Sequence, residues 1–471
     1  MPNKIHYLSI SEQSSLLKDK SLSPQEVATH FSQRIEKIDL DLNSFLTCPQ
    51  DRAVANYDEN KILSGIQFAA KDNFVTKDIL TTAGSKMLQD WIPPYNSTII
   101  SALAEEGAVL LGKTNCDEFA QGSTGEYSAY GATLNPWNTT CVSGGSSSGS
   151  AAAVSAGLCT FALGTDTGGS IRNPAAHCGV VGLKPSYGRL SRYGVIAMAS
   201  SLDCPGIIAR SIEDVQAVFE ILAKRDSFDQ TSISAENTAN MEAPLKIGIP
   251  NEYFESDLDP NLKLLLDQVQ QWYGSTGFEI VPISLPNTDQ AVPTYYILVP
   301  AEISSNMARF DGIRFGGSEK YIALEDIPAL RSELFGEEVQ RRILLGCFVL
   351  SSGYQDQYYK KALVARELIR SDFEAAFKNV DLILTPVTTG TAPMLNSLSN
   401  DPLKMYNEDV FTAPASLAGL PAISIPCGFA NSMPVGFQLI APKFQEELLF
   451  YAGIQYEKAH EWGQMHPELE I

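Results

Sequence analysis

The sequence is poor in histidine, in basic residues and in long apolar runs. Only five histidines occur in 471 residues, so a serine hydrolase with a histidine base has few candidates. The 55 acidic and 34 basic residues give a net charge of −21, which disfavours direct nucleic-acid binding because phosphate contacts need a basic surface. No apolar run approaches the length of a membrane span, and the N-terminus resembles neither a signal peptide nor a presequence. We therefore expect a cytoplasmic protein.

Cysteine is present but unpaired in the sequence. None of the eight cysteines forms a C-x-x-C pair, and none clusters with histidine at zinc-binding spacing. This pattern indicates reduced, mostly buried thiols. We expect no metal site and no cofactor in this chain.

The order of apolar segments predicts an α/β fold. Short apolar runs such as "IQFAA" and "CTFALG" alternate with helical segments on both sides of a polar stretch. We expect a single large domain, residues 1–471, with a central mixed β-sheet covered by helices on both faces. Its parts are N-terminal helices at about 9–60, a catalytic core at about 61–225, a surface loop at about 225–244, and the rest of the sheet at about 245–471.

One motif suggests nucleotide binding but stands in the wrong context. Gly107 to Thr114, "GAVLLGKT", matches the P-loop pattern letter for letter. A phosphate-binding loop needs flexible residues between its glycines, whereas "AVLL" has the composition of a strand. Gly107 follows "LAEE", which looks like the end of a helix. We therefore interpret the match as a helix stop followed by a strand.

A dense serine cluster at Ser143 to Gly157, "SGGSSSGSAAAVSAG", suggests nucleophilic chemistry. Ser147 has the G-x-S-x-G spacing of a nucleophile elbow, but the preceding residues look like a loop and not like the strand that an elbow needs. Of the histidines, only His177 lies close in sequence to a serine-rich loop. His30 lies in an early helix, and we expect it at the surface.

A second loop and a lysine complete the pattern. Ser170 lies in "TDTGGSIRNPAAHCG", after a predicted strand, where successive backbone N–H groups can bind an oxyanion. Lys71 ends the apolar run "GIQFAAK", where burial can lower its pKa so that the amine accepts a proton. Taken singly, these features also fit a surface lysine, helix-capping serines and a glycine turn.

Together, "KDN", "GGSSSGSAAAVSAG" and "GTDTGGSIRNPAAHCGVVGLKPSYG" resemble the amidase signature family. The resemblance implies that family's fold and a Ser–Ser–Lys triad without histidine. Lys71 matches the base, Ser146 the bridging serine after a cis peptide, and Ser170 the nucleophile. It also implies an oxyanion hole at Thr167, Gly168 and Gly169.

Later blocks narrow the resemblance to one branch of that family. "RFDGIRFG", "EVQRRILLG", "SSGYQDQYYKKA" and "DPLKMYNEDVFTAPASLAGLPAISIPCG" look like the A subunits of glutamyl-tRNA(Gln) amidotransferases. This likeness implies a glutaminase that supplies ammonia within a heterotrimer with B and C subunits. It also implies that Glu-tRNA(Gln) reaches the complex through the B subunit, where ATP and Mg²⁺ are used. The alternatives are a free-standing amidase and a catalytically silent scaffold.

The same likeness implies a glutamine pocket. Arg342 matches the residue that pairs with the substrate α-carboxylate, Asp409 matches the partner of the α-ammonium, and Tyr295 matches a pocket wall. Structural ion pairs are the alternative explanation for the two charged residues. The chain departs from the usual family pattern at Ser148, Asn173 and Cys204.

Overall fold

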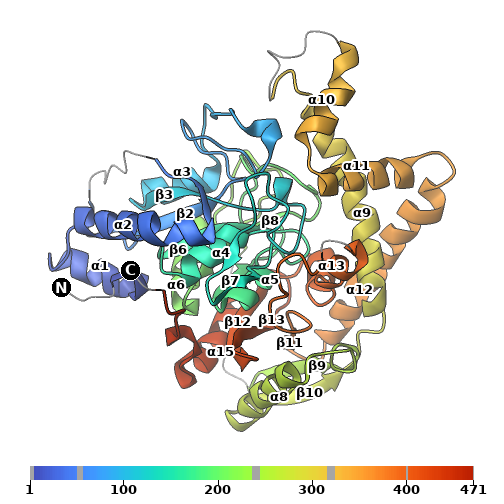
Figure 1. Cartoon of the computed structure of the whole chain (residues 1–471). Helices are drawn as coiled ribbons and strands as arrows, with labels where there is room; N and C mark the ends of the chain where they lie inside the picture. The colour runs from blue at the N-terminus through green and yellow to red at the C-terminus, as the bar shows by residue number, and fades with distance from the viewer. Residues whose placement is uncertain (1–4, 50–56, 236–243, 316–323, 399–400, 470–471) are drawn as a thin grey trace.

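The computed structural model describes residues 5–49, 57–235, 244–315, 324–398 and 401–469. In this described part, eleven strands form one sheet (Figure 1). Across the sheet the strands are, in order, β1 (Phe45–Thr47), β3 (Val109–Thr114), β2 (Gln67–Lys71), β6 (Phe161–Asp166), β8 (Cys204–Ala209), β7 (Val181–Lys184), β12 (Ala422–Ala430), β13 (Met433–Ile440), β11 (Leu382–Pro386), β9 (Lys246–Pro250) and β10 (Glu279–Ile283).

The sheet is mixed and continuous, as predicted. β2 runs parallel to β3 and β6, whereas β6 and β7 each pair antiparallel with β8. β7 pairs antiparallel with β12, so strands from both sides of the 225–244 segment join in one sheet. Residues 236–243 of that predicted surface loop lie outside the described residues.

Helices cover both faces of the sheet. Gly436 on β13 faces Ala176, whereas the side chain of Ile425 on the adjacent β12 faces Gly453 on the other side. The helices are α1 (Ile10–Lys18), α2 (Pro24–Leu42), α3 (Thr98–Glu105), α4 (Ser148–Ser155), α5 (Arg172–Cys178), α6 (Ile212–Leu222), α7 (Asn251–Phe254), α8 (Pro260–Ser275), α9 (Ala291–Asn306), α10 (Ile327–Leu334), α11 (Glu337–Leu350), α12 (Lys360–Ala376), α13 (Pro402–Asn407), α14 (Ala413–Leu417) and α15 (Glu446–Ala459). α5 therefore lies on one face and α15 on the other.

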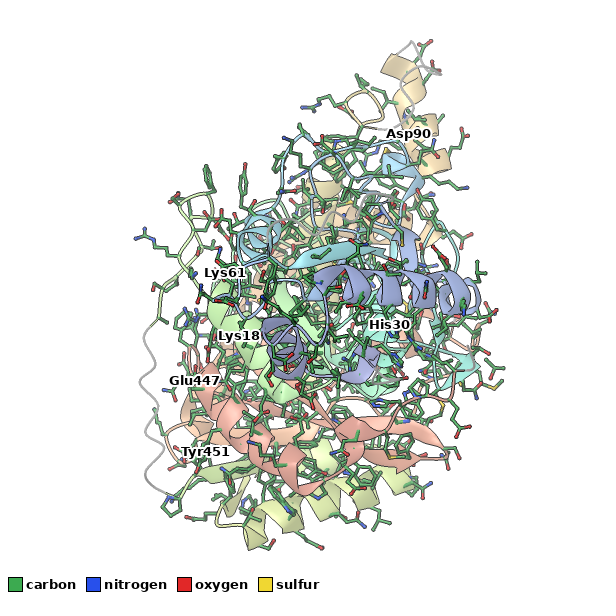
Figure 2. All side chains as sticks on the ribbon, turned by 90° about the vertical axis from the view of Figure 1, so that its left-hand side faces the viewer. Lys18, His30, Lys61, Asp90, Glu447 and Tyr451 are labelled. Atoms are coloured by element: carbon green, nitrogen blue, oxygen red, sulfur yellow. The ribbon has the colours of Figure 1, made fainter. Side chains whose placement is uncertain are left out.

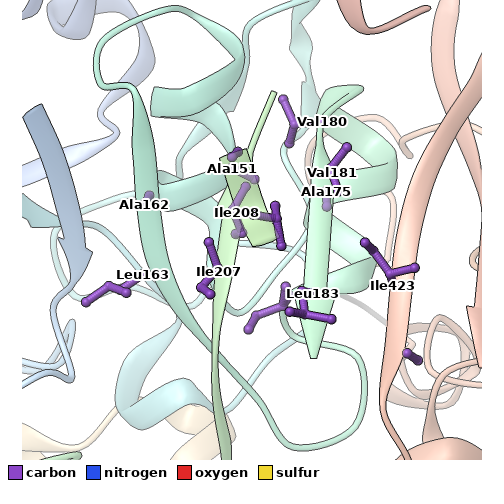
Figure 3. Packing of buried hydrophobic residues seen from close by; sticks show 14 of the residues in the cluster. Ala151, Ala162, Leu163, Ala175, Val180, Val181, Leu183, Ile207, Ile208 and Ile423 are labelled. Carbon is purple, nitrogen blue, oxygen red and sulfur yellow. The ribbon is translucent and has the colours of Figure 1, made fainter. Parts of the chain in front are cut away.

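Small residues bring α4 close to the centre of the sheet. Figure 3 shows Ala151 of α4 beside Ala162 of β6 and Ile208 of β8, within one continuous apolar core. All eight residues of α4 are buried. Alanine and serine allow this close approach because they add little volume between helix and strands. The serine cluster is therefore held rigidly against the strand that precedes Ser170.

The P-loop-like match is a helix stop and a strand, as the sequence predicts. α3 ends at Glu105, Gly107 has φ of 79°, and β3 begins at Val109. The left-handed conformation of Gly107 ends the helix. The four residues between the two glycines of the motif cannot cradle a phosphate because they enter the sheet.

The N-terminal region forms two helices, α1 and α2, separated by a short turn. Ser23 caps α2 through the predicted capping box with Glu26. His30 of α2 is half-buried, and its Nε2 lies 2.8 Å from Nδ1 of His6 (Figure 2). The prediction of a surface position for His30 was therefore wrong, because the segment before α1 packs against this helix.

A group of helices extends away from the sheet beside the site. α9, α11 and α12 pack together, with α10 at the far end (Figure 1). α9 carries Tyr295 and α11 carries Arg342. In the described residues, no helix combines the length and the apolar character that crossing a membrane requires.

Candidate active site

Lys71 is the last residue of β2 and is fully buried. Its Nζ donates to three hydroxyl oxygens: Ser146 Oγ at 2.8 Å, Ser147 Oγ at 3.1 Å and Thr165 Oγ1 at 2.9 Å. Burial lowers the pKa of Lys71 to about 8, although nearby acidic groups, including Asp117, act in the opposite direction. The neutral amine is therefore within reach at mildly alkaline pH, as a general base requires.

Ser146 reaches Lys71 from the glycine-rich turn before α4. The peptide bond between Gly145 and Ser146 is cis, as the family resemblance implies. Ser147 is the N-cap of α4, and no strand of the large sheet leads into it. The preceding stretch is not all loop, as we expected, because it holds the two-stranded sheet of β4 (Leu134–Asn135) and β5 (Asn138–Val142). Ser147 is still not a nucleophile elbow, since β5 ends five residues earlier.

Ser170 lies between β6 and α5, at the same sheet edge as Lys71, because β2 and β6 are parallel neighbours. Its exposed fraction is 7%, and its carbonyl accepts a hydrogen bond from the N–H of Ser147 at 3.1 Å. Among the described residues, no hydrogen bond joins the hydroxyls of Ser146 and Ser170. In structures without substrate, catalytic hydrogen bonds are often open and tighten only when substrate is bound.

The loop before Ser170 presents free backbone donors. The N–H groups of Gly168, Gly169 and Ser170 donate no hydrogen bond within the described chain. The hydroxyl of Thr167 is already engaged, because it donates to Asp203 at 2.7 Å. Of the three predicted oxyanion-hole residues, the two glycines thus have unused N–H groups, and Thr167 anchors the loop by its side chain.

Only glycine fits at position 168. A Cβ added to Gly168 would lie 2.5 Å from Cζ of Tyr295, so the tyrosine ring packs directly on the backbone. Tyr295 is buried, as expected of a pocket wall. The absence of a side chain therefore brings α9 and the oxyanion loop into contact.

A buried ion pair fixes the same loop from below. Arg172 donates to both carboxylate oxygens of Asp166 at 3.0 Å, and also to Gln438 and Ser416. Burial alone would raise the pKa of Asp166, but Arg172 holds it below its usual value. This pair joins the start and the end of the Ser170 loop, and the sequence alone did not suggest it.

Arg342 and Asp409 lie on two sides of a tyrosine network. Nε of Arg342 donates to Oε1 of Glu338 at 2.6 Å, and the hydroxyl of Tyr296 donates to Asp409 at 2.8 Å. Burial raises the pKa of Asp409 to about 7, although Tyr296 and Arg342 act in the opposite direction. Oδ1 of Asp409 lies 3.3 Å from the place that a Cβ on Gly169 would take, so this carboxyl group borders the Ser170 loop.

His177 is buried on α5, away from the Lys71 cluster in its contacts. Its Nε2 lies 3.6 Å from a carboxylate oxygen of Glu408, and neither ring nitrogen has a hydrogen-bond partner among the described residues. In that part of the chain, no three His, Cys, Asp or Glu side chains are grouped so that they could hold a metal ion. The chemistry available at this edge is therefore that of serine hydroxyls, a buried amine and backbone N–H donors.

Comparison with known proteins gives the same family as the motifs. A family model described as Amidase matches residues 26–450. The chain belongs to the amidase family. The A subunit of glutamyl-tRNA(Gln) amidotransferase from Geobacter metallireducens is 47% identical, over 97% of this chain and 98% of that protein. The protein of the same name from Coxiella burnetii is 46% identical, over 99% of this chain and 100% of that protein.

Solved structures of amidases superpose over nearly the whole chain. The crystal structure of the glutamyl-tRNA(Gln) amidotransferase A subunit from Thermotoga maritima has a TM-score of 0.85 at 35% identity, covering 99% of this chain and 98% of that one. The peptide amidase PAM, in complex with chymostatin, has a TM-score of 0.81 at 26% identity, covering 98% and 99%. The expected fold class is thereby confirmed.

Two of the departures of this amidase from the usual family pattern have partners in the structure. The hydroxyl of Ser148 donates to the hydroxyl oxygen of Thr133 at 3.2 Å, and Oδ1 of Asn173 accepts from the N–H of Gly145 at 3.3 Å. Cys204 is a buried residue of β8. None of the three replaces a residue of the Lys71 cluster.

Proposed function

We propose that this amidase is the glutamine-hydrolysing A subunit of a tRNA-dependent amidotransferase. The observation that carries the proposal is the pocket beside Ser170, where a buried cation, Arg342, and a buried carboxyl group, Asp409, are linked through Tyr296. Opposite charges at fixed spacing match the α-carboxylate and α-ammonium of an amino acid. Relatives of nearly the same length that carry this name support the proposal.

In the proposed first step, neutral Lys71 accepts the proton of Ser146, and Ser146 accepts the proton of Ser170. Ser170 Oγ then attacks the carbon of the glutamine side-chain amide. The N–H groups of Gly168, Gly169 and Ser170 donate to the oxyanion. This step requires the Ser170 hydroxyl to turn toward Ser146 once glutamine is bound.

The relay then runs in reverse. Ser146 returns a proton, supplied by Lys71, to the leaving nitrogen, and ammonia departs as the C–N bond breaks. The acyl group remains on Ser170 as a glutamyl ester. Water, deprotonated through the same relay, attacks the ester, and Ser170 recovers its proton as glutamate leaves.

The proposal includes the division of work between subunits. B and C subunits complete a heterotrimer, the B subunit uses ATP and Mg²⁺ on Glu-tRNA(Gln), and no cofactor belongs to this chain. The net charge of −21 supports a partner that holds the tRNA. We also propose that the complex is cytoplasmic.

A trapping experiment tests the proposal. The full chain, with B and C subunits, is mixed with glutamine, quenched in acid, and analysed by mass spectrometry for a glutamyl group on Ser170. We expect this adduct in the native chain and none in Ser170→Ala. Glutamine hydrolysis that rises when the partners and Glu-tRNA(Gln) are added supports an amidotransferase subunit. Equal hydrolysis of simple aliphatic amides without partners would instead indicate a free-standing amidase, and absence of any adduct a silent scaffold.

A further inference from the structure

Glu338 is a buried acid that the proposed reaction does not use. It lies in the first turn of α11, one turn before Arg342, and its side chain is 2% exposed. Oε1 accepts from Nε of Arg342 at 2.6 Å, and Oε2 accepts from Arg341. The hydroxyl of Tyr406 lies 3.5 Å from Oε1. Glu338 thus gathers its polar contacts from two helices, α11 and α13.

These contacts leave one side of the Arg342 guanidinium unused. A guanidinium carries five N–H donors in one plane. Nε is engaged by Glu338, whereas the two terminal nitrogens donate to no residue that the structure describes. A carboxylate accepts two parallel N–H bonds in the same plane. The free edge of Arg342 is therefore suited to the α-carboxylate of a substrate.

Aromatic rings limit the movement of this group further. The rings of Tyr296 and Tyr406 are stacked with centroids 3.8 Å apart, and Cζ of Arg342 lies 5.3 Å and 5.8 Å from those centroids. The guanidinium is thus bounded by the two rings and anchored at Nε by Glu338. Little side-chain entropy remains to be lost when a substrate binds.

Charge explains why an acid occupies this place. Arg341 and Arg342 are adjacent, and only Arg341 has substantial access to water, with 40% of its side chain exposed. A buried guanidinium without a partner is costly. Burial alone would lower the pKa of Arg342, but Glu338 raises it above its usual value. Two cations and one carboxylate leave a single positive charge for an incoming anion.

We propose that Glu338 is a positioning residue that sets the selectivity of the site for substrates with an α-carboxylate, by orienting Arg342. This inference rests on the proposed function, because it takes L-glutamine as the substrate. It assigns to Glu338 no contact with the reacting atoms. Its loss therefore affects recognition of the carboxylate and leaves the chemistry at Ser170 intact.

The test compares two substrates in the full complex. L-Glutamine carries the α-carboxylate, and 4-aminobutanamide is the same molecule without it. We measure ammonia release, with kcat and KM for each, in the native chain, in Glu338→Gln and in Glu338→Asp. Glu337→Gln is the matched control, because Glu337 is the exposed preceding residue of the same helix.

For Glu338→Gln we expect the preference for L-glutamine to fall about tenfold or more, through a higher KM, because truncating one member of a buried charge pair disturbs the other. Hydrolysis of 4-aminobutanamide stays within about twofold of the native rate, as does every rate of Glu337→Gln, since exposed charges contribute little. Glu338→Asp, which keeps the charge at shorter reach, restores part of the preference.

Two results overturn the inference: an unchanged preference in Glu338→Gln, or an equal loss on both substrates, which indicates a general structural role. Should Glu338→Gln not fold, Glu338→Asp decides, and an unaltered preference there overturns the inference. A native chain without preference for L-glutamine contradicts the proposed function itself, so the two failures are distinguishable.

Discussion

Thr165 Oγ1 lies 2.9 Å from Lys71 Nζ and accepts a second hydrogen bond from Nδ2 of Asn73 at 3.0 Å. The hydroxyl of Ser147 accepts from Lys71 and donates to the carbonyl of Thr165. A neutral amine has two N–H donors and one lone pair. With its donors given to Ser147 and Thr165, the lone pair of Lys71 is directed at Ser146. The surrounding hydroxyls thus select which serine loses its proton.

Replacing the base tests the relay most directly. Lys71→Ala removes the proton acceptor of Ser146, and we expect kcat for glutamine hydrolysis to fall by about 10²–10⁴-fold, the usual contribution of a general base. Ammonia release measures this. Lys77→Ala is the control, because Lys77 is exposed a few residues further along the chain. Near-native turnover in Lys71→Ala would show that another group is the base.

Thr165→Val tests the orientation of that base. Valine has nearly the same shape but cannot accept from Lys71, so the ammonium form loses a hydrogen bond and the pKa of Lys71 falls. We expect kcat to drop about tenfold and the acid limb of its pH profile to move to lower pH. Thr160→Val is the matched control, since Thr160 is buried just before the same strand and bonds to Gln13. A profile that stays in place in Thr165→Val contradicts this role.

Part of this site was readable from the sequence. The alternation of strands and helices indicated the fold class, and Lys71 at a strand end was recognisable because an apolar run stops there. The order of the strands was not, because neighbours such as β7 and β12 are separated by more than two hundred residues. Pairing at such range depends on packing of the whole sheet and leaves no local pattern.

The pocket shows where local signals were present but unused. Glu338 and Arg342 are four residues apart on a helix, a spacing that places them on one face. By contrast, no pattern separates Tyr295 from Tyr296. The structure assigns them different places, since Tyr295 packs on Gly168 and Tyr296 binds Asp409. Which of two adjacent helical residues faces a loop depends on the rotation of α9.

The pH dependence of the reaction follows from two buried groups. Lys71, with a pKa of about 8, must be neutral to act as a base, so we expect kcat to rise with pH through about 8. Asp409, with a pKa of about 7, must be ionised to bind the α-ammonium, so KM for glutamine falls as pH rises through about 7. Initial rates between pH 6 and 9 measure both, within the range of these two pKa values.

A substrate analogue separates the two effects. Glutaramate has the carboxylate and the amide of glutamine but no α-ammonium, so its KM should not follow the ionisation of Asp409, whereas its kcat should follow that of Lys71. If the KM values of glutamine and glutaramate change with pH in parallel, Asp409 is not the ligand of the ammonium.

Gly168→Ala tests whether the oxyanion loop depends on its contact with α9. The new methyl group would lie 2.5 Å from Cζ of Tyr295, which is buried and cannot withdraw, so the loop must move. Removal of an oxyanion donor costs about 10²–10³-fold in kcat, and we expect a loss of that order. Gly274→Ala is the control, because Gly274 lies within α8 with no atom closer than 3.4 Å to an added Cβ. There alanine is expected to raise stability by about 0.5–1 kcal/mol without changing the rate.

The double variant Gly168→Ala/Tyr295→Ala separates loop displacement from general damage. If the clash with the ring displaces the N–H donors, removing the ring lets the loop return, and the two losses in kcat combine to less than their product. Thermal denaturation of each variant checks that the chain remains folded. A multiplicative loss in the double variant, or native turnover in Gly168→Ala, would show that the close packing of Tyr295 on Gly168 does not position the oxyanion hole.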